Sequence, residues 1–319
     1  MTRKGDFFQK RIVIRDERHG LPYSKGIMAS SIMATGIPPK RAYRMSELVE
    51  ERLKESNRFS VSTNELRDVV VGVLREHVGE EHVQRYVRWQ SLGKLEKPLI
   101  ILIGGTTGVG KSTIATEIAH RLGITRVVST DALREVMRAI FSKELMPTLY
   151  DSSFSAWRGL REPLPAATDP VIVGFREQTI AVAVGMKAVI DRAIREGLNL
   201  VVEGVHIVPG FIDSKHFKSA FVVHLIITVE DENLHRSHFY IREMETEGFR
   251  PFERYRANFD SIRKIGKYIE DLSREKGIPI ISSRNLDTTV AMVLEEILNQ
   301  VFPPLEGGEA ALAPEREVL

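Results

Sequence analysis

Five short apolar runs alternate with helical patterns over the second two-thirds of the chain. They lie at residues 99–105, 126–130, 198–204, 220–229 and 278–283. Apolar residues fill the cores of these runs almost continuously, which is typical of strands that are covered on both faces. Such strands, separated by helices, predict an α/β fold: a three-layer sandwich with a parallel sheet between two layers of helices.

The first part of the chain has a different pattern. Residues 11–16 predict a short strand and Gly20, Leu21 and Pro22 a turn. Three helical segments follow, at 23–36, 40–55 and 63–79. Residues 91–98 are typical of a linker, and the end of the chain is rich in Pro, Gly, Ala and Glu. We therefore expect a small, mostly helical domain at 1–94, an α/β domain at 95–302 and a flexible tail at 303–319.

Composition narrows the classes of function. The chain has 319 residues, of which 43% are hydrophobic and 28% charged, as in ordinary globular proteins of two domains. No apolar run approaches the roughly 20 residues of a membrane span, and the N-terminus lacks an apolar signal core, so we expect a cytoplasmic protein without a membrane partner. The absence of cysteine excludes disulfides and thiol nucleophiles. A net charge of +2 does not indicate nucleic acid, whereas local basic clusters suit a small anionic substrate.

The segment GGTTGVGKST at 104–113 carries the strongest motif. Gly105, Gly110, Lys111 and Ser112 match G-x-x-x-x-G-K-[ST], the phosphate-binding P-loop. A glycine-rich turn that binds nothing is the alternative, but the preceding strand and the following amphipathic helix favour the P-loop. We predict that Lys111 reaches the β- and γ-phosphates of ATP and that Ser112 holds Mg²⁺. The predicted nucleotide-binding residues are Gly105, Thr106, Thr107, Gly108, Val109, Gly110, Lys111, Ser112 and Thr113.

A helix with two different faces follows the second predicted strand of the α/β domain. Its apolar stripe predicts a core-facing side formed by Leu133, Val136, Met137 and Ile140. Asp131, Arg134 and Arg138 are expected on the opposite side, at the sheet edge where open α/β folds bind ligands. A carboxylate beside two arginines can orient a hydroxyl while binding a phosphate or carboxylate. The alternative is a helix cap with solvated arginines.

Two further segments suggest parts of a phosphoryl-transfer site. The strand at 198–204 ends near Glu203, an acid placed to hold Mg²⁺ or its waters together with Ser112, while His206 is expected to be structural. Arginines at 236, 242, 250, 254 and 256 crowd the helical region after the strand at 220–229. They predict a lid in which Arg236 and Arg242 act in catalysis. A solvated helical face is the alternative, because several glutamates lie among these arginines.

The succession of these motifs resembles archaeal 2-phosphoglycerate kinases over nearly the whole chain. The likeness is carried by GGTTGVGKSTIATEIAHRLGI, VVSTDALREVMR, LYDSSFSAW, LVVEGVHIVPG, RYRANFDSIRKIGKYI and GIPIISS. It implies a P-loop kinase fold and transfer of the γ-phosphate of ATP, with Mg²⁺, to the 3-hydroxyl of 2-phosphoglycerate. The product, 2,3-bisphosphoglycerate, feeds cyclic 2,3-diphosphoglycerate synthesis in methanogens. We predict that Asp131, Arg134, Arg138, Ser152 and Ser153 bind this acceptor.

The N-terminal segment, residues 10–92, is similar to an ATP-cone, a small nucleotide-sensing module. IVIRD, GLPYSKGIMASSIMATGI and VSTNELRDVV carry this likeness. The cone pattern has a Lys-Arg pair before its Asp, whereas this chain has Ile14, Arg15 and Asp16, so a structural remnant or a surface for homo-oligomer formation is the alternative to nucleotide binding. For the whole chain, a kinase for another anionic alcohol and a nucleotide-responsive regulator without turnover are the alternatives.

Overall fold

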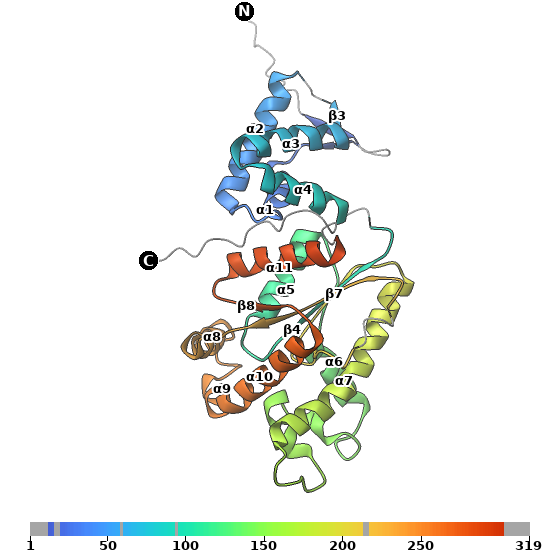
Figure 1. The fold of residues 1–319 in the computed structure, drawn as a ribbon, viewed down its shortest axis with the longest axis vertical. Coiled ribbons are helices and arrows are strands. Elements are labelled where there is room, and N and C mark those ends of the chain that lie inside the picture. Colours follow the sequence, from blue (N-terminus) through green and yellow to red (C-terminus); the bar gives the residue numbers. More distant parts are fainter. Residues whose placement is uncertain (1–11, 16–19, 58–59, 93–94, 213–216, 303–319) are drawn as a thin grey trace, which may run out of the picture.

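The computed structural model describes residues 12–15, 20–57, 60–92, 95–212 and 217–302. Its larger part is a five-stranded sheet covered by helices (Figure 1). The strands are β4 (Leu99–Gly104), β5 (Val127–Ser129), β6 (Leu200–Glu203), β7 (Phe221–Thr228) and β8 (Ile280–Ser282). Every neighbouring pair is parallel, in the order β5-β6-β4-β7-β8. The predicted parallel sheet is therefore confirmed.

Both faces of the sheet are buried at its central strands β4, β6 and β7, which explains their continuous apolar runs. On one face, Ile101 and Ile103 of β4 belong to the core cluster formed with α5 (Lys111–Leu122) and α11 (Leu286–Val301). On the other face, Ile100 and Leu102 pack in a cluster with α7 (Pro170–Arg195), and Ile226 of β7 lies in a cluster with α10 (Phe259–Lys276). The three-layer α/β sandwich is confirmed.

The position of β4 decides where a ligand can bind. From β4 the chain passes to β5 and β6 on one side and then to β7 and β8 on the other, so the strand order reverses at β4. A crevice opens at the carboxyl ends of parallel strands where the order reverses. The loop at 105–110 follows β4 directly and therefore lies at this crevice.

The N-terminal unit has a core of its own. It contains β1 (Val13–Arg15), β2 (Gly20–Pro22), β3 (Ser60–Ser62), α1 (Lys25–Met33), α2 (Pro39–Glu55), α3 (Thr63–His77) and α4 (Glu80–Leu92). The three predicted helices are confirmed, but residues 20–22 form a strand instead of a turn because they pair with β1. The likeness to an ATP-cone stays a prediction. Asp16 and the predicted tail at 303–319 lie outside the described residues.

Helix α4 packs against both units. Val83 and Tyr86 belong to the N-terminal core cluster, whereas Leu92 belongs to the cluster beneath α5 and α11 and Trp89 packs against it. The predicted domain boundary after residue 94 therefore separates α4 from the core of the α/β domain, although Leu92 of α4 belongs to that core. In the described part of the chain, no helix has the length and apolar character needed to cross a membrane.

We expect Arg88→Ala to lower the stability of the α/β domain. The Arg88 guanidinium donates to the Leu298 and Phe302 carbonyl oxygens and to Asn299 Oδ1, at 2.7 to 3.2 Å, where α11 ends. Removing a charged donor from these acceptors should cost about 2 kcal/mol in the free energy of urea unfolding. Arg85→Ala is the matched control, because the polar partners of Arg85 among the described residues are the exposed Glu81 and Glu295, and its loss should cost less than about 1 kcal/mol. Equal losses in the two variants would contradict the capping role.

Candidate active site

The loop after β4 has the backbone shape of a phosphate-binding loop. Gly105, Gly108 and Gly110 have φ angles of +132°, +88° and +86°, a region that side chains with a Cβ rarely adopt. A Cβ on Gly108 would also lie 2.4 Å from the Phe239 ring, so the loop is packed tightly from behind. Helix α5 begins at Lys111, and the positive end of its dipole faces the loop.

Lys111, Ser112 and Glu203 form the polar floor of the site. Lys111 is buried and its Nζ donates to the Thr106 carbonyl oxygen at 2.6 Å, while Ser112 Oγ donates to Glu203 Oε1 at 3.0 Å. Burial lowers the pKa of Lys111, an effect opposed by the carboxylates of Glu203 and Asp131. Burial raises the pKa of Glu203, opposed by Lys111 and by the bond from Ser112. Lys111 and Glu203 therefore each favour the charged form of the other, against the effect of burial.

A cavity of about 440 Å³ opens above this floor. It is lined by Thr107, Gly108, Gly110, Lys111, Ser112, Thr113, Asp131, Glu203 and Arg242 among the predicted site residues. The other predicted loop residues, Gly105, Thr106 and Val109, do not line the cavity but pack against the rest of the domain. Thr106 Oγ1 donates to the Ile262 carbonyl oxygen at 2.9 Å, Val109 is fully buried, and a Cβ on Gly105 would meet the Ile227 carbonyl oxygen. The structure therefore brings the loop, the metal-binding candidates and Asp131 to one cavity.

The predicted orientation of α6 (Thr130–Ile140) is wrong in part. Val136 and Ile140, expected in the core, are 59% and 70% exposed, and only Leu133 and Met137 pack against the cluster around α7. The Arg134 side chain is only 13% exposed. The reason is that α6 follows the edge strand β5 and packs on α7 and on the 3₁₀ helix η1 (Pro147–Tyr150), so that the side bearing Val136 and Ile140 faces away from both. The arginines therefore lie on the packed side, beside the segment at 147–152, instead of opposite the core.

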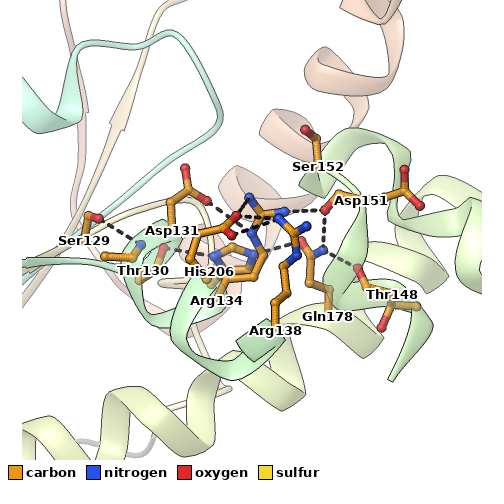
Figure 2. Close-up of polar contacts among 12 residues, drawn as sticks. Ser129, Thr130, Asp131, Arg134, Arg138, Thr148, Asp151, Ser152, Gln178 and His206 are labelled. Atoms are coloured by element: carbon orange, nitrogen blue, oxygen red, sulfur yellow. Dashed lines mark hydrogen bonds and ion pairs between the residues drawn. The ribbon is translucent and has the colours of Figure 1, made fainter. Parts of the chain in front are cut away.

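Arg134 lies next to Asp131, and Arg138 lies one turn further along α6 (Figure 2). Neither arginine lines the cavity. Arg134 donates to the Asp151 carbonyl oxygen, and its Nε lies 3.7 Å from Asp131 Oδ1. The guanidinium of Arg138 binds Glu135 at 2.7 Å and lies over the Tyr150 ring. The side chain of Asp131 itself is 68% exposed and lines the cavity.

The two predicted serines lie in the connecting segment after Asp151. Ser152 Oγ accepts a hydrogen bond from Arg254 Nη2 at 2.6 Å, whereas Ser153 is buried at the start of the 3₁₀ helix η2 (Ser153–Gly159). One predicted lid arginine thus reaches the segment that Arg134 also contacts. Neither serine is among the residues that line the cavity.

Helix α8 (Glu232–Glu245) brings one of the two predicted catalytic arginines to the cavity. Arg242 lines it, whereas the guanidinium of Arg236 lies 3.7 Å from the centre of the Phe259 ring, away from the lining. His235 Nε2 donates to the Thr107 carbonyl oxygen at 2.8 Å, and His238 Nδ1 donates to the Gly108 carbonyl oxygen at 2.9 Å. The first turns of α8 are therefore fixed to the phosphate-binding loop itself.

Several lining residues are not among those predicted from the sequence. They are Ile114, Gly204, Val205, His238, Ile241, Glu245, Ser283, Arg284, Asn285 and Leu286. The last four residues follow β8 at the carboxyl edge of the sheet. Their position directly after the fifth predicted strand could therefore have identified them as candidate site residues. The arginine cluster after the strand at 220–229 indicated that α8 contributes to the site, but which of its other residues line the cavity depends on tertiary packing.

Three buried histidines predict a pH dependence of stability. Burial lowers the pKa of His206, His224 and His235 from 6.5 to about 4. Between these values the unfolded chain binds more protons than the folded chain, so the free energy of unfolding should rise with pH up to about 6.5 and then level off. Urea unfolding at pH 4.5, 5.5, 6.5 and 7.5 tests this, and His224→Leu should reduce the slope. A flat profile from pH 4.5 to 6.5 would contradict neutral buried rings.

No family model matches the chain, but similar proteins are known. The chain is 41% identical over 305 residues to the 2-phosphoglycerate kinase of Methanopyrus kandleri, covering 95% of this chain and 91% of that protein. It is 40% identical to the 2-phosphoglycerate kinase of Methanothermobacter thermautotrophicus, covering 93% and 95%, and 38% identical to that of Methanocaldococcus jannaschii, covering 93% and 94%.

Two solved structures have a more distant likeness. A gluconokinase from Sinorhizobium meliloti is 15% identical, with a TM-score of 0.36 over 64% of this chain and 93% of its own. A shikimate kinase from Acinetobacter baumannii is 18% identical, with a TM-score of 0.36 over 65% and 93%. The sequence relatives are far closer and extend over both the N-terminal unit and the α/β domain. The chain therefore belongs to the 2-phosphoglycerate kinase family.

Proposed function

We propose that this protein transfers the γ-phosphate of ATP to the 3-hydroxyl of 2-phosphoglycerate, which gives 2,3-bisphosphoglycerate. The observation that carries the proposal is the meeting of Lys111, Ser112, Glu203 and Asp131 at one cavity. A phosphate-binding loop with an acid across the cavity is what phosphoryl transfer to an alcohol requires. Identity to named 2-phosphoglycerate kinases supports the choice of acceptor.

Each residue has a role that follows from its contacts. Lys111 uses one N–H on Thr106 and has two left for phosphate oxygens. Ser112 and Glu203 present the hard oxygen ligands that Mg²⁺ takes, and Mg²⁺, when bound, neutralises charge on the β- and γ-phosphates. Asp131 accepts the proton of the acceptor hydroxyl, and Arg242 faces the transferred group from α8. Arg134 binds an anionic group of the acceptor beside Asp131.

Arg134→Lys should raise the acceptor KM about tenfold or more and leave the KM for ATP nearly unchanged. The reason is that lysine lacks the planar fork by which Arg134 contacts both Asp131 and the Asp151 carbonyl. Steady-state kinetics with each substrate varied in turn measures the split. Arg138→Lys, one turn further from the cavity and paired with Glu135, should have the smaller effect. A rise in the KM for ATP alone would assign Arg134 to the nucleotide.

The function itself is tested by incubating the purified protein with Mg²⁺-ATP and a panel of phosphorylated and carboxylated alcohols. ADP release and phosphorus NMR of the product are followed together. We expect 2-phosphoglycerate to be the best acceptor and the product to carry phosphates on carbons 2 and 3. A clearly better acceptor of another structure would favour the alternative kinase, and ATP binding with no turnover on any acceptor would favour the regulator.

The remaining expectations stay predictions. They are the nucleotide-sensing role of the N-terminal unit, the homo-oligomer, the cytoplasmic location and the absence of nucleic-acid and membrane partners. Isothermal titration of the Lys111→Ala variant with ATP tests for a second nucleotide site in the N-terminal unit. In this variant ATP binding at the phosphate-binding loop is weakened, so a second binding event can be seen.

A further inference from the structure

A buried hydrogen-bond chain connects four segments that are separate in the sequence (Figure 2). His206 lies after β6, and its Nδ1 is 2.9 Å from Thr130 Oγ1, at the first turn of α6. Its Nε2 is 2.9 Å from Gln178 Oε1, on α7. The Gln178 amide nitrogen donates to the Asp151 carbonyl oxygen at 3.0 Å and to the Thr148 carbonyl oxygen. Thr130, Gln178 and His206 are all fully buried.

The proton positions in this chain follow from its ends. The Gln178 amide faces two backbone carbonyls, which only accept, so its NH₂ group must point at them and its oxygen at His206. His206 must therefore carry a hydrogen on Nε2. Because burial keeps the ring neutral, Nδ1 is an acceptor and the Thr130 hydroxyl donates to it. Only one arrangement of protons satisfies every buried group.

The two ends of the hydrogen-bond chain hold Asp131 and Arg134, which form the two sides of the proposed acceptor site. Thr130 immediately precedes Asp131, and a Cβ on Gly204 would lie 1.8 Å from Thr130 Oγ1, so the segment after Glu203 touches the start of α6. At the other end, the Asp151 carbonyl accepts from Gln178 and also from Arg134. A displacement at either end would therefore move Asp131 or Arg134.

We propose that Thr130, His206 and Gln178 are positioning residues of the acceptor site, which set Asp131 and Arg134 at a fixed separation without touching substrate. The proposal rests on the proposed function for the identity of the acceptor. It assigns each end a different kinetic effect. Thr130 orients the proton acceptor Asp131, so its loss should lower kcat. Gln178 holds the Asp151 carbonyl, the partner of Arg134, so its loss should raise the acceptor KM.

Two nearly isosteric variants test the two ends. Thr130→Val should lower kcat about tenfold or more, and Gln178→Met should raise the acceptor KM by a similar factor, with the KM for ATP changed less than about twofold in both. Thr179→Val is the matched control, because Thr179 is equally buried on α7 and donates only to the Phe175 carbonyl of its own helix. It should lower the melting temperature without changing either kinetic constant. If Thr130→Val and Gln178→Met also lower the melting temperature without changing kcat or the acceptor KM, the hydrogen-bond chain only stabilises the fold and the proposal is wrong.

A spectroscopic measurement tests the same chain without turnover. Long-range proton-nitrogen NMR of histidine-labelled protein at neutral pH distinguishes protonated from unprotonated ring nitrogens. We expect the His206 signals, identified by their loss in His206→Phe, to show Nε2 protonated and Nδ1 not. The opposite tautomer or a charged ring would overturn the proposal even where a variant fails to fold. If the wild-type protein is inactive toward 2-phosphoglycerate, the proposed function is rejected instead. The His206 tautomer would still test the proton arrangement in the hydrogen-bond chain.

Discussion

Lys111→Ala should leave the fold intact and lower kcat by several orders of magnitude. The Lys111 ammonium is buried, and it bonds only the Thr106 carbonyl among the described residues, with no ion pair. A buried cation with lowered pKa adds little to stability, so its removal should change the melting temperature by only a few degrees. Its charge acts instead on the γ-phosphate as negative charge moves during transfer, where electrostatic stabilisation is strongest.

The matched control for Lys111 is Lys97→Ala. Lys97 also donates to a backbone carbonyl, that of Lys218, but it is exposed and lies at the opposite end of the sheet, before β4. Activity and thermal unfolding are measured on the same preparations. Lys97→Ala should keep full activity. A folded Lys111→Ala variant with near-normal turnover would reject the phosphate-binding role of the loop.

Asp131→Asn should lower kcat by about 10² to 10⁴ with little change in the acceptor KM. The amide keeps the size of the carboxylate and its hydrogen-bonding reach, but it cannot accept the proton of the acceptor hydroxyl. Asp131 suits this role because it lines the cavity together with Lys111 and Glu203 and is accessible to substrate.

Glu135→Gln is the matched control for Asp131. Glu135 is an exposed carboxylate on the same helix that pairs with Arg134 and Arg138 and does not line the cavity, so its loss can change the acceptor KM but removes no proton acceptor. Its loss should leave kcat nearly unchanged. Steady-state kinetics of both variants, with the acceptor and ATP varied separately, gives the comparison. Equal effects in the two variants, or a loss confined to the KM for ATP, would remove Asp131 from the role of proton acceptor.

Local patterns in the sequence were enough to predict the sheet and the phosphate-binding loop. Strands buried on both faces must be apolar throughout, and a loop that wraps phosphate must contain glycine at positions of positive φ such as Gly108. Lys111, Ser112 and Glu203 follow from the same logic, since the motif and the strand end place them at one sheet edge. These features depend on short segments, and their physical cause is local.

The orientation of α6, the shared helix α4 and the hydrogen-bond chain through His206 were decided only by tertiary structure. An amphipathic pattern predicts which residues can face a core, but the positions of the neighbouring elements determine which of them do, and Val136 and Ile140 are exposed. Nothing near His206 in the sequence indicates Thr130 or Gln178, which lie 76 and 28 residues away. Sequence periodicity describes neighbours along one element, whereas these contacts join elements that meet only after the chain has folded.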